Sequence, residues 1–201
     1  MMIPIVISTI GSSSLVVLEA SIKTYVPDAE IIISRNRGTN FGDAYNIVVN
    51  EAFEKYDEII VANDDIVLTP TSYSHLMEDV THLKRFNKLG WVVARSDEVR
   101  PLQKGKGDIL EVPVVSPLFG YISKEAWVDL APINWYGDDI QCIDMSANGC
   151  RHFVSRSYVH HVGSQTIGQD NRKNHLESEP WIKKNRPDLY NIWFIQEKKV
   201  A

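Results

Sequence analysis

Two carboxylates stand side by side directly after an apolar stretch of the chain. Residues 58–62 read Glu-Ile-Ile-Val-Ala, and Asn63, Asp64 and Asp65 follow at once. Adjacent carboxylates repel each other unless a cation or hydrogen-bond donors offset their charge. Hard cations such as Mg²⁺ and Mn²⁺ prefer carboxylate oxygen. The pattern therefore indicates a divalent cation site, and its alternative is a plain turn rich in Asn and Asp.

A second acidic pair follows a loop that contains two aromatic residues. Asp138 and Asp139 come after Trp135, Tyr136 and Gly137. One aspartate could cap the helix expected at about residues 139–148, but a cap does not account for both. A carboxylate in a partly apolar mouth is suited to act as a general base. We therefore treat the pair as candidate catalytic residues.

Two adjacent histidines, His160 and His161, end a stretch rich in β-branched and aromatic residues. If this stretch is a strand, its side chains alternate between the two faces of the sheet. At most one of the two histidines then faces a site. That histidine is either a metal ligand or a structural residue, because histidine serves both roles.

Strands and helices must bring these residues together, and the first 95 residues show a pattern of alternating strands and helices. Parallel strands joined by helices form a sheet that is covered on both faces, and ligands bind at the carboxyl ends of its strands. Thr9, the loop at residues 35–42 and Asn63–Asp65 all lie at such ends. Strands are expected at residues 3–9, 30–34, 58–62 and 91–94, and helices at about 15–25, 45–56 and 71–89.

The second half of the chain has a looser pattern. We expect one domain over residues 1–201, in which residues 96–201 form a smaller half beside residues 1–95. The segment Lys104–Asp108 is either a loop or a lid. A strand-like stretch is expected at residues 111–116, short helices at 123–130 and 139–148, a strand at 153–162 and a helix that starts at Pro180.

Bulk properties exclude several classes of protein. A length of 201 residues suits one domain, and a net charge of −5 argues against a broad phosphate-binding surface for nucleic acid. No apolar run has the length of a membrane helix, and the N-terminus lacks the basic region of a signal peptide. Cys142 and Cys150 do not form a disulfide framework. Two free thiols predict a cytoplasmic protein.

Taken in order, the motifs resemble glycosyltransferases of the GT-A fold, a Rossmann-like α/β fold, and in particular their family-2-like branch. The resemblance covers roughly residues 3 to 165 and starts with the first strand and its polar end. The segments that carry it are Asn36–Gly38 with Gly42–Asn46 before a helix, Val61–Pro70 as the acidic metal motif, Pro117–Glu125 as the acceptor-side glycine segment, Tyr136–Ile140 as the motif of the catalytic base, and His161–Ser164 as the C-terminal histidine motif.

The resemblance implies a metal-dependent transfer of a hexose from a nucleotide sugar, most plausibly a UDP-hexose, to an acceptor hydroxyl with inversion. Asp65 is implied as the main ligand of Mn²⁺ or Mg²⁺, with His161 as a further ligand and His160 as the fallback. Asp139 is implied as the catalytic base, with Asp138 beside it. The implied nucleotide-sugar contacts are Thr9, Asn36, Arg37, Asn63, Asp64 and Gly120.

The chain also departs from this family, and other functions stay open. The stretch from Thr9 to Asn63 is shorter than usual, so one strand and the acidic contact to the nucleobase are expected to be missing. Asn63 replaces the first carboxylate of the metal motif. The brief second half suits a small acceptor or a partner subunit, which includes a homo-oligomer. The alternatives are a nucleotide-sugar-binding module and another metal enzyme, such as a nucleotidyltransferase or phosphoesterase.

Overall fold

The computed structural model describes residues 2–35, 37–162 and 171–196. Its first part alternates strands and helices as the sequence predicts. The strands β1 and β2 pair in parallel, with Ile5 opposite Ile31, and β1 also pairs in parallel with β3, where Ile5 lies opposite Ile60. The elements of this part are β1 (Ile5–Thr9), α1 (Leu15–Tyr25), β2 (Ile31–Arg35), α2 (Phe41–Phe53) and β3 (Glu58–Asn63).

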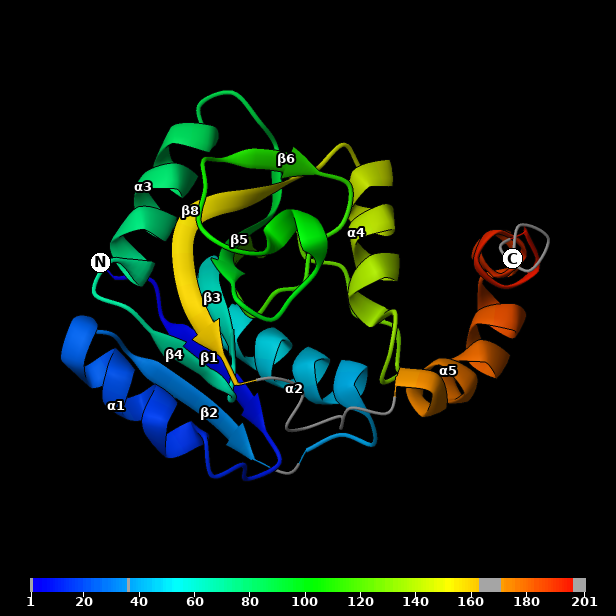
Figure 1. The fold of residues 1–201 in the computed structure, drawn as a ribbon, viewed down its shortest axis with the longest axis horizontal. Helices are drawn as coiled ribbons and strands as arrows, with labels where there is room; N and C mark the ends of the chain where they lie inside the picture. Colours follow the sequence, from blue (N-terminus) through cyan, green and yellow to red (C-terminus); the bar gives the residue numbers. More distant parts are fainter. Residues whose placement is uncertain (1, 36, 163–170, 197–201) are drawn as a thin grey trace.

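The rest of the chain adds strands of both directions and the C-terminal helices (Figure 1). Its elements are β4 (Ile66–Leu68), α3 (Ser72–Leu83), β5 (Leu89–Ser96), the 3-10 turn η1 (Pro101–Gln103), β6 (Leu110–Val112), β7 (Phe119–Ser123), α4 (Gly137–Ala147), β8 (Arg151–His161), α5 (Asn171–Asn185), α6 (Pro187–Tyr190) and the π-helical turn η2 (Asn191–Gln196).

All the strands belong to one sheet, in the order β2-β1-β3-β7-β5-β8-β4, with β6 paired to β8. Five of the eight strands in the described part of the chain (β1, β2, β3, β5 and β8) point the same way, and β4, β6 and β7 run against them. The predicted fold class, an α/β protein with a mostly parallel central sheet and helices on both faces, is confirmed.

Two apolar cores lie on opposite faces of this sheet because side chains of a strand alternate. Along β1, Ile5 and Ile7 pack in the core that contains α1 and α3. The residue between them, Val6, packs in the core that contains α2 and the buried face of α4. This arrangement fixes the carboxyl ends of β1 and β3 at the edge where the polar residues follow.

Several expectations about the second half are wrong. No helix forms at residues 123–130; residues 119–123 are instead the strand β7, which lies between β3 and β5. Its residues are buried on both faces, so they give no alternating pattern that would mark them as a strand. The helix expected at residues 71–89 ends at Leu83, the three-residue strand β4 was not expected, and Pro180 lies inside α5 rather than at a helix start.

The C-terminal helices α5 and α6 extend from the α4 side of the molecule (Figure 1). They pack on α4 and the segment before it through a third apolar cluster that includes Ile133, Ile140, Ile182 and Phe194. Within the three described ranges, none of the helices has both the length and the apolar character needed to cross a membrane.

Candidate active site

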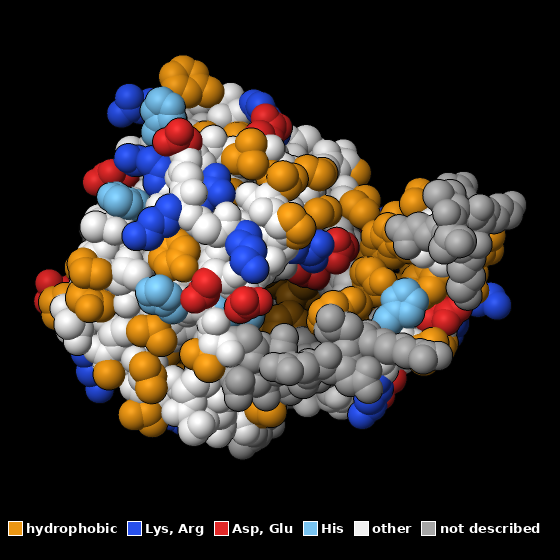
Figure 2. All heavy atoms as spheres, viewed as in Figure 1, with side chains coloured by type: hydrophobic (Ala, Val, Ile, Leu, Met, Phe, Trp, Pro, Cys, Tyr) orange, Lys and Arg blue, Asp and Glu red, His pale blue; other side chains and the backbone are white. Residues whose placement is uncertain are grey.

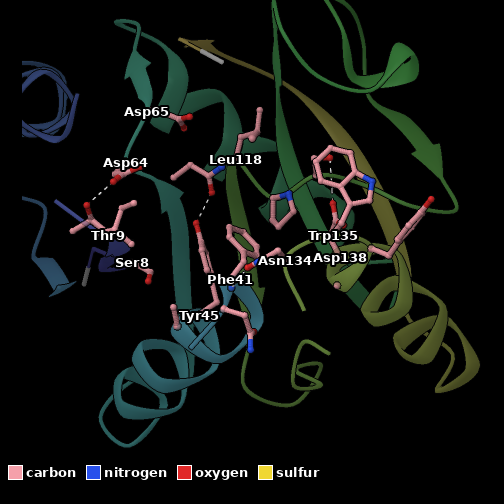
Figure 3. Close-up of a pocket in the computed structure, with 18 of the residues that line it drawn as sticks. Ser8, Thr9, Phe41, Tyr45, Asp64, Asp65, Leu118, Asn134, Trp135 and Asp138 are labelled. Atoms are coloured by element: carbon pink, nitrogen blue, oxygen red, sulfur yellow. Dashed lines mark hydrogen bonds between the residues drawn. The ribbon is translucent and has the colours of Figure 1, made fainter. Parts of the chain in front are cut away.

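A cavity of about 1010 Å³ opens where β1 and β3 end and where α2 and α4 begin. Figure 2 shows the surface hollowed at its centre, with acidic side chains beside the hollow. In the close-up, Thr9, Asp64 and Asp65 lie on one side, and Trp135 and Asp138 lie on the other (Figure 3). The carboxyl edge of the sheet therefore holds both acidic pairs that the sequence singled out.

The last residue of β3 and the residue after it are held by hydroxyl groups from neighbouring elements. The Thr9 hydroxyl donates to the Asp64 carboxylate, and the Tyr45 hydroxyl of α2 donates to the side-chain oxygen of Asn63. Burial, together with the charges of Asp64 and Asp65, raises the pKa of Tyr45 well above its ordinary value, so the phenol stays protonated and remains a donor. These contacts fix the turn that presents Asp65.

Asp65 lies next to His161 because β4 and β8 pair antiparallel, with Ile66 opposite His161. The His161 Nε2 atom is 3.2 Å from the Asp65 Oδ2 atom. Its Nδ1 atom is 2.6 Å from the Glu98 carbonyl oxygen. A carbonyl only accepts, so Nδ1 carries a proton and a neutral His161 turns the lone pair of Nε2 toward Asp65. A proton or a cation is then needed between the two atoms.

The pair fits a divalent cation. Ligand atoms bound at about 2.1 Å at right angles lie about 3.0 Å apart, close to the observed separation of 3.2 Å. Both side chains are largely buried, with exposed fractions of 11% for His161 and 5% for Asp65. Within the described residues no group of three or more His, Cys, Asp or Glu forms a full cage. Two protein ligands suit Mg²⁺ or Mn²⁺, which keep waters and substrate phosphates as further ligands.

The electrostatics of His161 agree with this arrangement. Burial opposes a charge on the imidazole, but the contacts with the Asp65 carboxylate and the Glu98 carbonyl outweigh it and raise the pKa of His161. The site therefore favours positive charge at Nε2. The neighbouring His160 points away and lies 3.2 Å from the Asp97 carboxylate, in an exposed position. Of the two histidines, the geometry selects His161.

The second acidic pair lies in the first turn of α4 and faces one arginine. The Arg100 guanidinium donates to both oxygens of Asp139, at 2.9 and 2.8 Å, and to Asp138 at 2.9 Å. Its Nε atom donates to the Ser116 hydroxyl at 2.8 Å. Burial and the neighbouring charge of Asp138 raise the pKa of Asp139, although Arg100 opposes the shift.

The helix α4 begins after an unusual backbone turn. Tyr136 has φ of 70°, and it is the sole non-glycine residue with positive φ in the described ranges. Such a conformation costs about 1–3 kcal/mol and persists where the surroundings hold it. The Tyr136 ring stacks on Trp193 at a centroid distance of 5.0 Å, and its hydroxyl lies 2.6 Å from His175 Nδ1. The C-terminal helices thus hold the turn that aims Asp138 and Asp139 at the cavity.

The other predicted contacts have mixed outcomes. Thr9, Arg37, Asn63 and Asp64 line the cavity, but the Arg37 guanidinium already forms a two-pronged ion pair with Glu51 at 2.6 Å. The predicted contact Asn36 lies outside the described residues.

Gly120, the remaining predicted contact with the nucleotide sugar, is not among the residues that line the cavity. It lies inside β7, paired with Val61 and Val93. A Cβ atom there would come within 3.0 Å of Val93 and 3.2 Å of the Trp91 ring. A larger residue would therefore have to displace these side chains slightly, because the sheet packs closely at this point.

Sequence reasoning missed Arg100, Glu98 and Tyr45. Arg100 meets Asp139 across a separation of 39 residues in the chain, and Glu98 contacts His161 through its backbone carbonyl, which no residue type reveals. Tyr45 was expected only on the apolar face of its helix. The one available signal was the position of Arg100 just after a strand whose end lies at the same edge of the sheet.

Comparison of the sequence with protein families and with curated proteins gives no match. Solved structures do match. The crystal structure of A197 from STIV is 12% identical, with a TM-score of 0.52 over 79% of this chain and 81% of that one. S. aureus TarS 1–349 is 11% identical, with a TM-score of 0.53 over 80% of this chain and 60% of that one.

A longer S. aureus TarS structure is 9% identical, with a TM-score of 0.55 over 90% of this chain and 39% of that one. The chain therefore spans less than two thirds of either TarS structure. At these identities the likeness concerns the fold alone, and it is a compact GT-A-like fold of the kind that the motifs predicted.

Proposed function

We propose that this protein is a metal-dependent glycosyltransferase that moves a hexose from a nucleotide sugar to an acceptor hydroxyl. The observation that carries the proposal is the pairing of Asp65 with His161 at 3.2 Å in a cavity that Asp139 also lines. A cation offsets the charge of a diphosphate donor, and a base takes the proton of an acceptor hydroxyl. The cavity holds candidates for both.

The donor half of the site is formed by the ends of β1 and β3. Thr9 and Asn63 line the cavity there and are each held by a hydrogen bond. Asp65 and His161 are the residues that would hold Mn²⁺ or Mg²⁺. When bound, such a cation offsets the negative charge that grows on a departing diphosphate. The choice of a UDP-hexose follows from the family resemblance and is the most specific part of the proposal.

The acceptor half is formed by the start of α4. Asp139 takes the proton of the acceptor hydroxyl while that oxygen attacks the anomeric carbon. A raised pKa suits this role, because a stronger base accepts the proton more readily once it is ionised. Direct attack with one base inverts the configuration at the anomeric carbon. The anomer of the product, followed by NMR, distinguishes inversion from retention.

The two histidines provide a matched test of the cation site. Binding of UDP-sugars is measured by calorimetry with and without Mn²⁺ for the wild type, His161→Ala and His160→Ala. We expect His161→Ala to weaken Mn²⁺-dependent binding at least about tenfold, since loss of even a second-shell partner of a metal costs about 10–100-fold. His160→Ala should bind as the wild type does, because its side chain points away from Asp65.

Equal binding by the wild type and His161→Ala would remove the cation site from the proposal. Mn²⁺-dependent binding without any turnover would favour the alternative of a nucleotide-sugar-binding module. The compartment that we propose is the cytoplasm, and the support for it is the presence of two free, buried thiols, Cys142 and Cys150.

A further inference from the structure

The segment between β5 and β6 contacts both halves of the site. The Asp97 carboxylate accepts from the His161 backbone N–H at 2.8 Å, and the Glu98 carbonyl lies 2.6 Å from the His161 Nδ1 atom. Two residues later, Arg100 reaches Asp138 and Asp139. One short stretch of chain therefore touches the histidine of the cation site and the carboxylate that would take the proton.

Arg100 holds Asp139 in a fixed orientation. Its Nη1 and Nη2 atoms each donate to a different oxygen of Asp139, at 2.9 and 2.8 Å. This two-pronged geometry matches the planar guanidinium to the planar carboxylate and restricts rotation of both groups. The Ser116 hydroxyl completes the set, because it accepts from Arg100 Nε and lies 3.3 Å from the Asp138 carboxylate. All three nitrogens of the guanidinium are thus used.

Arg100 is itself fixed by a buried glutamine three residues further along. Gln103 is 1% exposed. Its Nε2 atom donates at 2.8 Å to the carbonyls of Ala94 and Ser116, and its Oε1 atom accepts from the Ser116 N–H at 3.0 Å. These bonds tie the segment to β5 and to the chain that enters β7. Arg100 therefore approaches the acidic pair from a rigid support.

The charge balance of this cluster depends on the arginine. Asp138 and Asp139 are adjacent, and their side chains are only 20% and 17% exposed. Burial and the neighbouring charge of Asp138 both favour the protonated form of Asp139. The buried Cys142 thiol also lies near the pair, and burial keeps it neutral. The charged residues Glu98, Lys173 and Glu177 line the same cavity. Arg100 is the cation that forms ion pairs with both carboxylates in the described part of the chain.

We propose that Arg100 is a positioning residue that favours the ionised form of Asp139 and holds it in the orientation for proton transfer. The inference rests on the proposed function in one respect, which is the role of Asp139 as the base. Arg100 acts through Asp139 and needs no contact with the donor or the acceptor.

The first test measures the carboxylates directly. The side-chain ¹³C signals of Asp138 and Asp139 are titrated by NMR in the wild type, Arg100→Gln and Arg100→Lys. An opposite charge nearby lowers a carboxyl pKa by about 1–3 units, so Arg100→Gln should raise the pKa of Asp139 by that amount. Arg100→Lys keeps the positive charge, so its carboxyl pKa should stay close to the wild-type value. The matched control is Arg186→Ala, which removes an ion pair with Asp144 on the same helix.

The second test measures kcat/KM against pH. In Arg100→Gln the acidic limb should move up by the same 1–3 units, which means a loss of about 10–1000-fold below the limb that recovers as pH rises. A uniform loss at every pH with an unmoved limb would show a merely structural role and overturn the proposal.

The two tests separate this inference from the proposed function. If the wild type transfers no sugar, the proposed function fails and the NMR titration still decides whether Arg100 controls the charge of Asp139. Unchanged carboxyl pKa values in Arg100→Gln would overturn the inference, whatever the activity. Thermal unfolding of each variant shows whether it folds. If Arg100→Gln does not fold, the same measurements are made on Arg100→Lys.

Discussion

Gly42 joins the two halves of the protein through a very close backbone contact. It is the second residue of α2, and its N–H donates to the Ile133 carbonyl at 3.3 Å. A Cβ atom built at Gly42 would lie 1.9 Å from the Ala131 carbonyl oxygen and 2.8 Å from the Ala131 carbonyl carbon. The neighbour is backbone, so it cannot turn away as a flexible side chain would. Gly42→Ala must therefore push the segment 131–134 off the start of α2.

The sign of this substitution follows from two opposing effects. Alanine favours a helix over glycine by about 1 kcal/mol. Extra volume in a packed site costs about 1–3 kcal/mol, and a backbone clash belongs at the upper end of that range. We expect a net loss of about 2 kcal/mol, which lowers Tm by roughly 4–8 °C for a chain of this size. Thermal unfolding and the urea midpoint both measure it.

Gly137 provides the matched control, because it also begins a helix beside the same carbonyl. A Cβ atom at Gly137 would lie 3.5 Å from the Ala131 carbonyl oxygen, which is an ordinary contact. Gly137→Ala should therefore keep or slightly raise Tm. If Gly42→Ala proves as stable as the wild type, the close packing of α2 on the segment before α4 is refuted.

Two further predictions concern ionisable groups. Burial and the charge of Asp138 raise the pKa of Asp139. The acidic limb of kcat/KM should therefore lie above the ordinary pKa of aspartate, and activity should rise with pH as the base ionises. A limb at or below that pKa would contradict the assignment of Asp139 as the base. Burial raises the pKa of Cys142 to about 12, so at neutral pH iodoacetamide should label Cys142 only after unfolding. Rapid labelling of the native protein, located by mass spectrometry, would show that this thiol is accessible.

The sequence predicted the first half of the fold well because local patterns decide it. Alternating apolar stretches marked β1, α1, β2, α2 and β3, and these elements place Thr9 and Asn63–Asp65 at one edge. The second half was harder because tertiary packing overrides local patterns there. Residues 119–123 form a central strand only because β3 and β5 lie on either side.

The candidate site shows the same division. The acidic pairs and His161 were visible because each stands at the end of an expected element. The family resemblance favoured His161 over His160, and the register of β8 against β4 places His161 beside Asp65. Arg100 and the Glu98 carbonyl were not visible, since their contacts depend on how one loop folds over the edge of the sheet. Long-range contacts of isolated residues leave no spacing in a sequence.

The most direct test of the central claim is the release of nucleotide from nucleotide sugars by the purified protein. A panel of nucleotide sugars is incubated with and without Mn²⁺, and the free nucleotide is measured for the wild type and for Asp65→Asn. Under the proposed function, water can take the place of the acceptor, so we expect slow Mn²⁺-dependent release by the wild type and none above background by Asp65→Asn. Release that is equal in the two proteins, or that does not require a divalent cation, would contradict the account.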